Sequence, residues 1–286
     1  MLIKRALKYG YCSGVRVADL KVRRFAKSGK RGAILGQVVH NERVVSEMEA
    51  LGMCTVNSIE EATEPTIVFS AHGVPPSFHE RAKTTGLEVL DTTCTFVYDI
   101  HNESREALIA GFHLVFIGEP DHREVVGYTN DLAVGAYHVV TTLEQAESIN
   151  WGKFSGVRIF YQTTLNADDF EGIVSVIESG CGDVKRADTI CYATRENQEA
   201  ARNLAEDPKI NIVLVIGGTA SANTRHLWEI TSRIKPSYLI QDTRDIHESW
   251  FEGVDGVGIT AGASTPDALV DEVEEWIVAF RSKEIE

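Results

Sequence analysis

The chain has 286 residues, of which 43% are hydrophobic and 24% are charged, as in globular proteins that bury a core without disulfides. Its formal net charge of −14 argues against nucleic-acid binding as a main role, because that role needs a basic face. No apolar run approaches the roughly 18 residues of a membrane span, and the N-terminus lacks a signal-peptide pattern. We therefore expect a cytoplasmic protein with no nucleic-acid and no membrane partner.

The cysteines are odd in number and widely spaced, which is not the pattern of a disulfide framework. In a reducing compartment, sparse cysteines more often serve metals or catalysis. The five are Cys12, Cys54, Cys94, Cys181 and Cys191.

Residues 1–88 are predicted to form an α/β module of three units, each a strand, a polar turn and a helix. The segment LKYGYCSGVRVADLKVRRFA places Cys12 in the first turn, before an amphipathic helix. GAILGQVVHNERVVSEMEALG places His40 after the second strand, and TIVFSAHGVPPSFHERAK places His72 after the third.

Residues 89–184 are predicted to form a second module with the same three units. EVLDTTCTFVYDIHNESREAL carries Cys94, and HLVFIGEPDHREVVGYTND carries His122 and Glu124. VRIFYQTTLNADDFEGIVSVI carries the pair Thr163 and Thr164. In both modules the histidine of the second unit follows the cysteine by 28 residues.

Residues 185–286 are predicted to form a third module. RADTICYATRENQEAARNLA carries Cys191, and NIVLVIGGTASANTRHLWEI carries Ser221 and Asn223, the serine standing 30 residues after the cysteine. GVGITAGASTPDALVDEVEEW carries Ser264.

Strands that alternate with helices are typical of parallel α/β sheets, whose ligands bind beyond the carboxyl ends of the strands. The polar turns fall at that end in every module. The predicted fold class is therefore α/β, with three pseudo-repeated modules of mostly parallel sheet around a common centre. Linkers are expected near residues 86–89 and 180–186.

Three cysteines at equivalent places in a repeat indicate a metal site formed by Cys12, Cys94 and Cys191. Ligands from three distant segments suit a [4Fe–4S] cluster, whose fourth iron would stay open to a substrate oxygen. Spacing alone leaves a zinc site with three cysteine ligands as the alternative. Cys54 and Cys181 lie outside the pattern, and we expect each to be a small hydrophobic core residue.

The other polar turn residues are mostly hydrogen-bond donors beside glycines at helix N-termini, which favours a phosphate or another anion. The alternative for any Ser, Thr or Asn among them is helix capping. We interpret Glu124 as a proton donor, because burial beside an anion and a cluster would raise its pKa. The alternative for Glu124 is a solvated residue in the first turn of a helix.

The motifs of these turns, taken together, resemble the 4-hydroxy-3-methylbut-2-enyl diphosphate reductase family, the last enzymes of the methylerythritol phosphate route to isoprenoids. The resemblance runs from about residue 3 to residue 280, with the motifs in the family order. The motifs are GYCSGV, VVHN, SAHGVPP, HREVVG, QTT, DTICYAT, ASANT and GITAGASTP.

The resemblance implies that the three cysteines hold a [4Fe–4S] cluster with one open iron, which binds the allylic hydroxyl. Two electrons from ferredoxin or flavodoxin and two protons would remove that hydroxyl as water, giving isopentenyl and dimethylallyl diphosphate. The residues implied for substrate binding are His40, His72, His122, Ser221, Asn223 and Ser264. Those implied for proton delivery are Glu124, His122, Thr163 and Thr164.

The sequence departs from the family pattern in or near this pocket. The family usually has Pro in place of Thr95 and Arg123, a basic residue near Tyr98, and a second serine in place of Ala222. Losing a hydroxyl that donates to phosphate costs about 1.5–3 kcal/mol, which Arg123 could offset unless it faces solvent. The usual substrate is expected. The alternatives are a paralogue that reduces another hydroxylated anion, and a non-catalytic metal- or ligand-binding protein.

Overall fold

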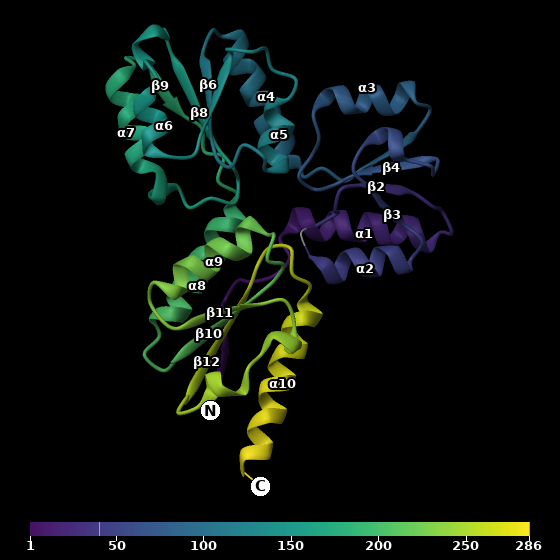
Figure 1. Ribbon diagram of the computed structural model, residues 1–286, viewed down its shortest axis with the longest axis vertical. Coiled ribbons are helices and arrows are strands. Elements are labelled where there is room, and N and C mark those ends of the chain that lie inside the picture. The colour runs from purple at the N-terminus through teal and green to yellow at the C-terminus, as the bar shows by residue number, and fades with distance from the viewer. Residues whose placement is uncertain (40, 286) are drawn as a thin grey trace. The chain divides into compact units, whose positions relative to one another are not determined.

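The computed structural model describes residues 1–39 and 41–285, with side chains described through residue 282 (Figure 1). The chain divides into two compact units, each made of segments that are not consecutive in sequence. Unit 1 consists of Met1–Arg16, His40–Val44 and Tyr192–Glu286, and unit 2 consists of Val17–Val39 and Val45–Cys191.

Unit 2 contains two parallel sheets of four strands each. The first has the order β3-β2-β4-β5, and its strands are β2 (Ala33–Leu35), β3 (Cys54–Val56), β4 (Thr66–Phe69) and β5 (Glu88–Asp91). The second has the order β7-β6-β8-β9, and its strands are β6 (His113–Ile117), β7 (Tyr137–Val140), β8 (Val157–Tyr161) and β9 (Val184–Arg186).

Unit 1 contains the third parallel sheet, with the order β1-β12-β10-β11. Its strands are β1 (Leu2–Arg5), β10 (Ile212–Ile216), β11 (Ser237–Ile240) and β12 (Gly256–Ala261). All three sheets therefore share one topology, and the predicted fold class of three parallel α/β modules is confirmed. In the third sheet the fourth place is filled by β1, which comes from the other end of the chain.

The sheets do not begin and end where the predicted modules do. The linkers predicted near residues 86–89 and 180–186 are wrong, because β5 pairs with β4 and β9 pairs with β8. Each of these strands completes one sheet and leads into the next cysteine. Likewise β1 pairs with β12, although the predicted first module contains its residues. The division into three domains at 88 and 184 stays a prediction.

A helix follows most of the strands, as the alternating pattern predicts. The helices are α1 (Ser13–Lys27), α2 (Glu42–Ala50), α3 (Pro76–Thr84), α4 (Thr95–Ile109), α5 (Arg123–Thr129), α6 (Leu143–Ser148), α7 (Glu171–Gly180), α8 (Tyr192–Glu206), α9 (Ala222–Ser232) and α10 (Asp267–Ile285). No helix within the described residues is both long enough and apolar enough to cross a membrane.

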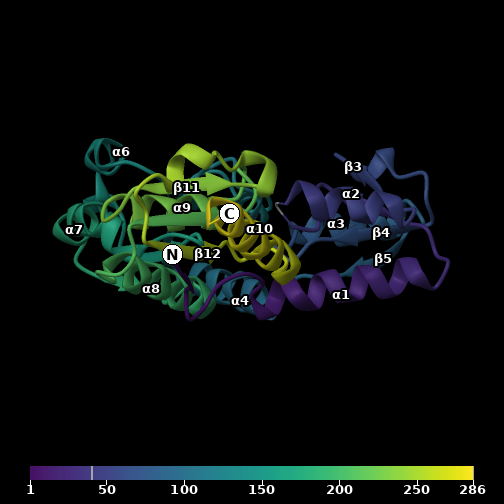
Figure 2. The ribbon, with the colours of Figure 1, turned by 90° about the horizontal axis from the view of Figure 1, so that it is seen from below.

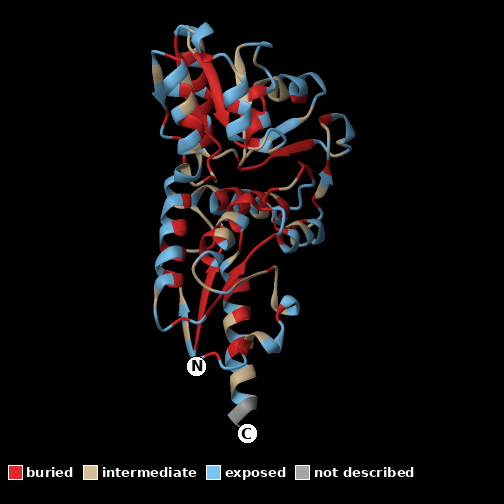
Figure 3. Ribbon diagram, turned by 60° about the vertical axis from the view of Figure 1, so that its left-hand side comes forward, coloured by how far each residue is buried: buried red, intermediate tan, exposed pale blue. Residues whose placement is uncertain are grey.

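Helices cover both faces of the sheet in unit 1 (Figures 1 and 2). Apolar residues of α10 pack with β10 and β12 on one face, and residues of α8 and α9 pack with β10 on the other. Central strands such as β6 and β10 are buried throughout, as Figure 3 shows in red. Burial on both faces explains why their sequences, HLVFI and IVLVI, are apolar apart from His113 rather than alternating.

Candidate functional site

The three predicted metal ligands occupy equivalent positions in the fold. Cys12, Cys94 and Cys191 each directly precede a helix of 15 residues, namely α1, α4 and α8. A helix N-terminus favours negative charge, and all three cysteines stand at such an end. Ser13 and Tyr192, which follow the first and third cysteines, lie together in unit 1 with their hydroxyls 2.7 Å apart.

In unit 1, Cys12 lies beside residues predicted to bind the anion. The Cys12 amide donates to the Ala263 carbonyl at 3.4 Å, and the Ala263 amide donates to Asn223 Oδ1 at 2.9 Å. Ser264 Oγ donates to Ser221 Oγ at 3.3 Å. The structure therefore brings Ser221, Asn223 and Ser264 together at the carboxyl ends of β10 and β12.

The start of α9 holds buried donors that the fold leaves unused. Asn223 Nδ2 and Thr224 Oγ1 are buried without a hydrogen-bond partner within the described residues. Because buried amides are normally paired, the Asn223 amide fits an external acceptor such as a phosphate oxygen. Ser221 does act as a cap, since its Oγ accepts from the Thr224 amide at 3.3 Å.

Small residues let α9 approach the sheet this closely. A Cβ atom added to Gly262 would lie 2.0 Å from Thr224 Oγ1, and one added to Gly217 would lie 2.5 Å from it. Gly217 also has a φ of +153°. The glycines beside the predicted anion site therefore set the position of the helix N-terminus.

In unit 2, the turns that follow β4, β5, β8 and β9 meet around Cys94 and Cys191. The Cys94 amide donates to the Ala71 carbonyl at 3.1 Å, and the Cys191 amide donates to the Thr163 carbonyl at 3.1 Å. Burial is the main cause that raises the pKa of the Tyr128 hydroxyl. Electrostatic interactions with Glu124, and then with both cysteines, raise that pKa further. Cys94 and Cys191 thus lie near one buried tyrosine.

Glu124 is only 1% exposed, so the alternative of a solvated helix residue is wrong. The Thr163 amide donates to Glu124 Oε2 at 3.1 Å, and the Tyr128 hydroxyl donates to Oε1 at 2.9 Å. Burial raises the pKa of Glu124, and the two hydrogen bonds offset part of that rise. Thr163 therefore links the buried Glu124 carboxyl to Cys191, since its amide donates to Glu124 and its carbonyl accepts from the Cys191 amide.

The two described histidines of the site lie beside this acid. His122 caps α5, where its Nδ1 accepts from the Glu124 amide at 3.3 Å. A neutral His122 ring therefore carries its proton on Nε2, which is the nitrogen able to donate to a ligand. The ring of His72 meets that of His122 edge to face, with centroids 6.1 Å apart.

Thr164 is positioned by a residue that the sequence reading did not single out. Gln162 is 1% exposed, and its Nε2 donates to Thr164 Oγ1 at 2.9 Å. Its Oε1 accepts from the Glu119 amide at 3.0 Å. Tyr128 was missed as well, although its place four residues after Glu124 on one helix was a usable signal.

Arg123 makes its described contacts inside unit 2, at the end of β2. Its Nη1 donates to the Leu35 carbonyl at 3.3 Å, at the end of β2. The guanidinium fills the space beside Gly36, where an added Cβ would lie 1.3 Å from Nη1. Arg123 has no carboxylate partner among the described residues.

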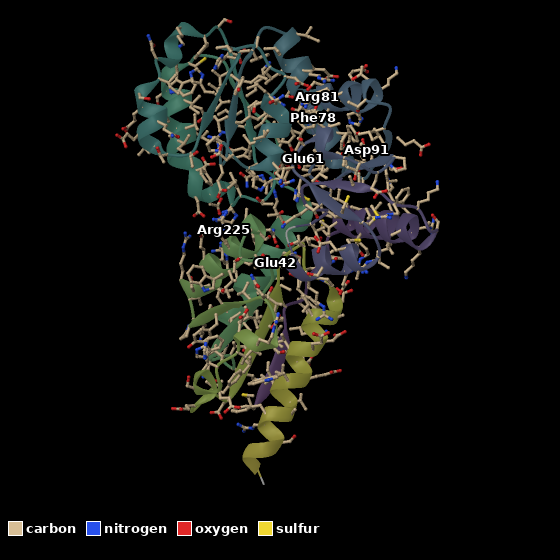
Figure 4. All side chains as sticks on the ribbon, turned by 45° about the vertical axis from the view of Figure 1, so that its right-hand side comes forward. Glu42, Glu61, Phe78, Arg81, Asp91 and Arg225 are labelled. Atoms are coloured by element: carbon tan, nitrogen blue, oxygen red, sulfur yellow. The ribbon has the colours of Figure 1, made fainter. Side chains whose placement is uncertain are left out.

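The other departures have local explanations. The Tyr98 hydroxyl hydrogen-bonds to Asp91, which is labelled in Figure 4, and burial followed by Asp91 raises the pKa of Tyr98 to about 12. Asp91 also accepts from the Thr93 amide at 2.8 Å, which steadies the turn before Cys94. Thr95 is exposed at the first position of α4, and nothing in the structure explains it.

Several predicted features cannot be placed in one site. His40 lies outside the described residues. Cys12 belongs to unit 1, and Cys94 and Cys191 belong to unit 2, so the convergence of all three stays a prediction. No group of three or more His, Cys, Asp or Glu within the described part of the chain is placed to hold a metal ion.

The remaining two cysteines have local contacts of their own. Cys181 packs in an apolar core of unit 2, and Cys54, the first residue of β3, has its Sγ 3.7 Å from the Gly32 carbonyl. These contacts agree with structural roles for Cys54 and Cys181. None of the five cysteines forms a disulfide.

Comparison with known proteins identifies the family. The family model of the LytB protein matches residues 3–278. The chain belongs to the LytB family. LytB relatives named 4-hydroxy-3-methylbut-2-enyl diphosphate reductase match the chain almost from end to end. The relative from Tolumonas auensis is 34% identical, covering 100% of this chain and 94% of its own. The relative from Aquifex aeolicus is 35% identical, and the match covers 94% of this chain and 93% of that relative.

Solved structures of LytB-like reductases share the fold. The E-1-hydroxy-2-methyl-but-2-enyl-4-diphosphate reductase from Plasmodium falciparum is 25% identical, with a TM-score of 0.89 over 97% of this chain and 87% of that one. A second structure is titled as (E)-4-hydroxy-3-methyl-but-2-enyl diphosphate reductase, the terminal enzyme of the non-mevalonate pathway. It is 34% identical, with a TM-score of 0.72, and the match covers 98% of this chain and 100% of that one.

Proposed function

We propose that this LytB protein reductively removes the allylic hydroxyl of 4-hydroxy-3-methylbut-2-enyl diphosphate, giving isopentenyl and dimethylallyl diphosphate. The names and coverage of its relatives support this activity. The structural observation that carries it is the buried Glu124 carboxyl, held by Thr163 beside Cys191. Removing a hydroxyl as water needs a proton donor near the electron source, and a buried carboxyl beside a cysteine ligand suits that role.

Cys12, Cys94 and Cys191 would hold a [4Fe–4S] cluster with one iron open. The donor set fits this group, because the three cysteines stand at equivalent positions, each directly before a 15-residue helix. When bound, the cluster would supply the electrons and a Lewis-acidic iron for the hydroxyl oxygen. Ferredoxin or flavodoxin would supply electrons to it in a cytoplasmic setting.

The diphosphate would be held mainly by residues at the start of α9 and after β12. Asn223 offers an amide without a partner among the described residues, and Ser221 and Ser264 lie beside it. His40 and His72 complete the predicted set. Buried donors aimed at an anion are worth more than exposed ones, because they give up little water on binding.

Glu124 would provide the proton that converts the departing hydroxyl into water. The balance is one hydroxyl removed, two electrons and two protons consumed, and one water released. The His122 Nε2–H and the Thr164 hydroxyl would orient the hydroxyl, and the Thr163 amide would hold Glu124. A general acid of this kind contributes about 10²–10⁴-fold to a rate.

The test is an anaerobic assay of protein whose iron and sulfide content has been measured. Reduced viologen is mixed with the protein and 4-hydroxy-3-methylbut-2-enyl diphosphate, and its oxidation and both products are followed. We expect rapid bleaching and formation of both diphosphates. An intact cluster without bleaching would contradict the proposed substrate and favour another hydroxylated anion. A colourless, zinc-containing protein would contradict the reductase itself.

The matched variant for this assay is Glu124→Gln, which keeps the shape of the side chain and removes its acid. We expect normal cluster content, normal substrate affinity and turnover reduced by about 10²–10⁴-fold. Normal turnover by Glu124→Gln would show that another group donates the proton.

A further inference from the structure

Tyr128 is the second hydrogen-bond partner of the Glu124 carboxyl. It lies on the last turn of α5, four residues after Glu124, and is 3% exposed. Its hydroxyl is 2.9 Å from Glu124 Oε1. Its ring packs against Phe116 and edge to face against His101, with centroids 5.8 Å and 4.8 Å away. These contacts hold the hydroxyl in one place.

The two oxygens of Glu124 differ in the kind of partner they have. Oε2 faces the Thr163 amide at 3.1 Å, and an amide N–H can only donate. Oε1 faces a hydroxyl, which can accept while Glu124 is a protonated acid and donate once it is a carboxylate. The bond at Oε1 can therefore reverse its direction when the proton leaves, and the bond at Oε2 cannot.

Within the described residues, the hydrogen-bond partners of the Glu124 carboxyl are the Thr163 amide and the Tyr128 hydroxyl, and neither is a cation. The neighbouring Arg123 is turned away, toward the Leu35 carbonyl and Gly36. A tyrosine hydroxyl ordinarily has a pKa of about 10, so the Tyr128 hydroxyl is neutral near pH 7 and available as a donor. The hydrogen bond that it donates to Glu124 is charge-assisted whenever Glu124 is ionised.

We propose that Tyr128 is a positioning residue for proton donation, whose hydroxyl aims Glu124 and stabilises the carboxylate left behind. The inference rests on the proposed function, since it assumes that Glu124 donates the proton. Tyr128 acts through Glu124 and has no contact with substrate in this assignment. Its loss should therefore slow the chemical step and leave substrate binding unchanged.

The kinetic test compares Tyr128→Phe with Tyr137→Phe. Tyr137 is the matched control, because it packs around the same Phe116 ring and its hydroxyl has no partner within the described residues. We expect Tyr128→Phe to lower kcat by about ten- to a hundredfold, the effect of one hydrogen bond to a charge, with KM and iron content unchanged. Tyr137→Phe should match the wild type.

A second readout does not depend on turnover. A protonated buried carboxyl gives an infrared C=O band, which is assigned to Glu124 by its disappearance in Glu124→Gln. Because the band frequency follows hydrogen bonding to the carboxyl, it should shift in Tyr128→Phe and stay in place in Tyr137→Phe.

The outcomes separate the inference from the proposed function. If Glu124→Gln loses turnover while Tyr128→Phe keeps wild-type kcat and an unshifted band, the role of Tyr128 is refuted and the reductase stands. If the wild type does not reduce the substrate, the proposed function fails, and the infrared band alone decides whether Tyr128 holds Glu124. A parallel fall in kcat for both tyrosine variants would mean a general packing effect and would also refute the role.

Discussion

Gly36 and Arg123 show at the residue scale how one substitution depends on another. The Arg123 guanidinium occupies the place of a side chain at position 36, and Gly36 has a φ of +72°. Only glycine supplies both the space and the backbone conformation at no cost. An arginine at the start of α5 is therefore compatible with this fold because position 36 has no side chain.

We predict that Gly36→Ala destabilises the protein more than Gly29→Ala does. Both positions have a positive φ, which costs a residue with Cβ about 1–2 kcal/mol, but Gly29 faces open space. The additional loss of unfolding free energy in Gly36→Ala, compared with Gly29→Ala, is the cost of displacing the Arg123 guanidinium. Urea unfolding of both variants, alone and combined with Arg123→Ala, measures it. An excess that persists without Arg123 would contradict this explanation.

Two buried histidines give a second prediction at the residue scale. Burial, acting first, lowers the pKa of His101 and that of His113 to about 4 each, against an unfolded value of about 6.5. The fold favours the neutral rings, so this stability is fully present above pH ~6.5 and is lost as the pH falls toward 4. The loss amounts to at most about 3 kcal/mol for each histidine.

The measurement is the free energy of unfolding at pH 7 and at pH 5. We expect His101→Gln and His113→Gln each to lose less stability than the wild type over this interval. His247→Gln, at an exposed position, is the control and should follow the wild type. Equal slopes for all four proteins would mean that neither buried ring carries the acid sensitivity.

At the scale of elements, the strand–turn–helix units were readable because their central strands are long and apolar. The strands β3, β7 and β11 were not predicted. They are sheet-edge strands of three or four residues with partly exposed side chains, so neither alternation nor a long apolar run marks them. The sheet membership of β1 was also out of reach, because its partner β12 lies about 250 residues away.

The sequence also predicted part of the candidate site. Polar residues at equivalent turns indicated which side chains lie together, and Ser221, Asn223 and Ser264 do. Tyr128 and Gln162 were missed because they act through other side chains, and such contacts depend on how helices pack. The burial of Glu124 likewise follows from the packing of α5 on its sheet.

The contact between α9 and the β12 turn gives a prediction at this scale. In Gly262→Ala the new Cβ would lie 2.0 Å from Thr224 Oγ1 and 3.2 Å from Thr224 Cα, so α9 must shift. That shift strains the Ala263–Asn223 hydrogen bond, and we expect KM for the substrate to rise by about tenfold. Gly182→Ala, which meets open space, is the control. An unchanged KM would show that anion binding does not depend on the position of α9.

At the scale of the whole molecule, the metal prediction concerns residues that belong to both units. Cys94→Ser should abolish the cluster and turnover together. The proposed cluster has only three cysteine ligands, so it cannot lose one of them. Cys54→Ser is the matched control, since Cys54 is a half-buried residue outside the set. Iron and sulfide analysis of anaerobically purified variants measures this. Full iron content in Cys94→Ser would remove Cys94 from the ligand set.

The strand β1 has a consequence for biosynthesis. Of the described strands β1 is synthesised first, and the strand that it pairs with, β12, follows about 250 residues later. At about 5–20 residues per second, β1 waits roughly 10–50 s with an open edge. A free edge strand invites pairing with other chains, and short length and charge are the usual protection. LIKR has four residues, two of them basic, so the segment that waits longest is poorly suited to aggregate.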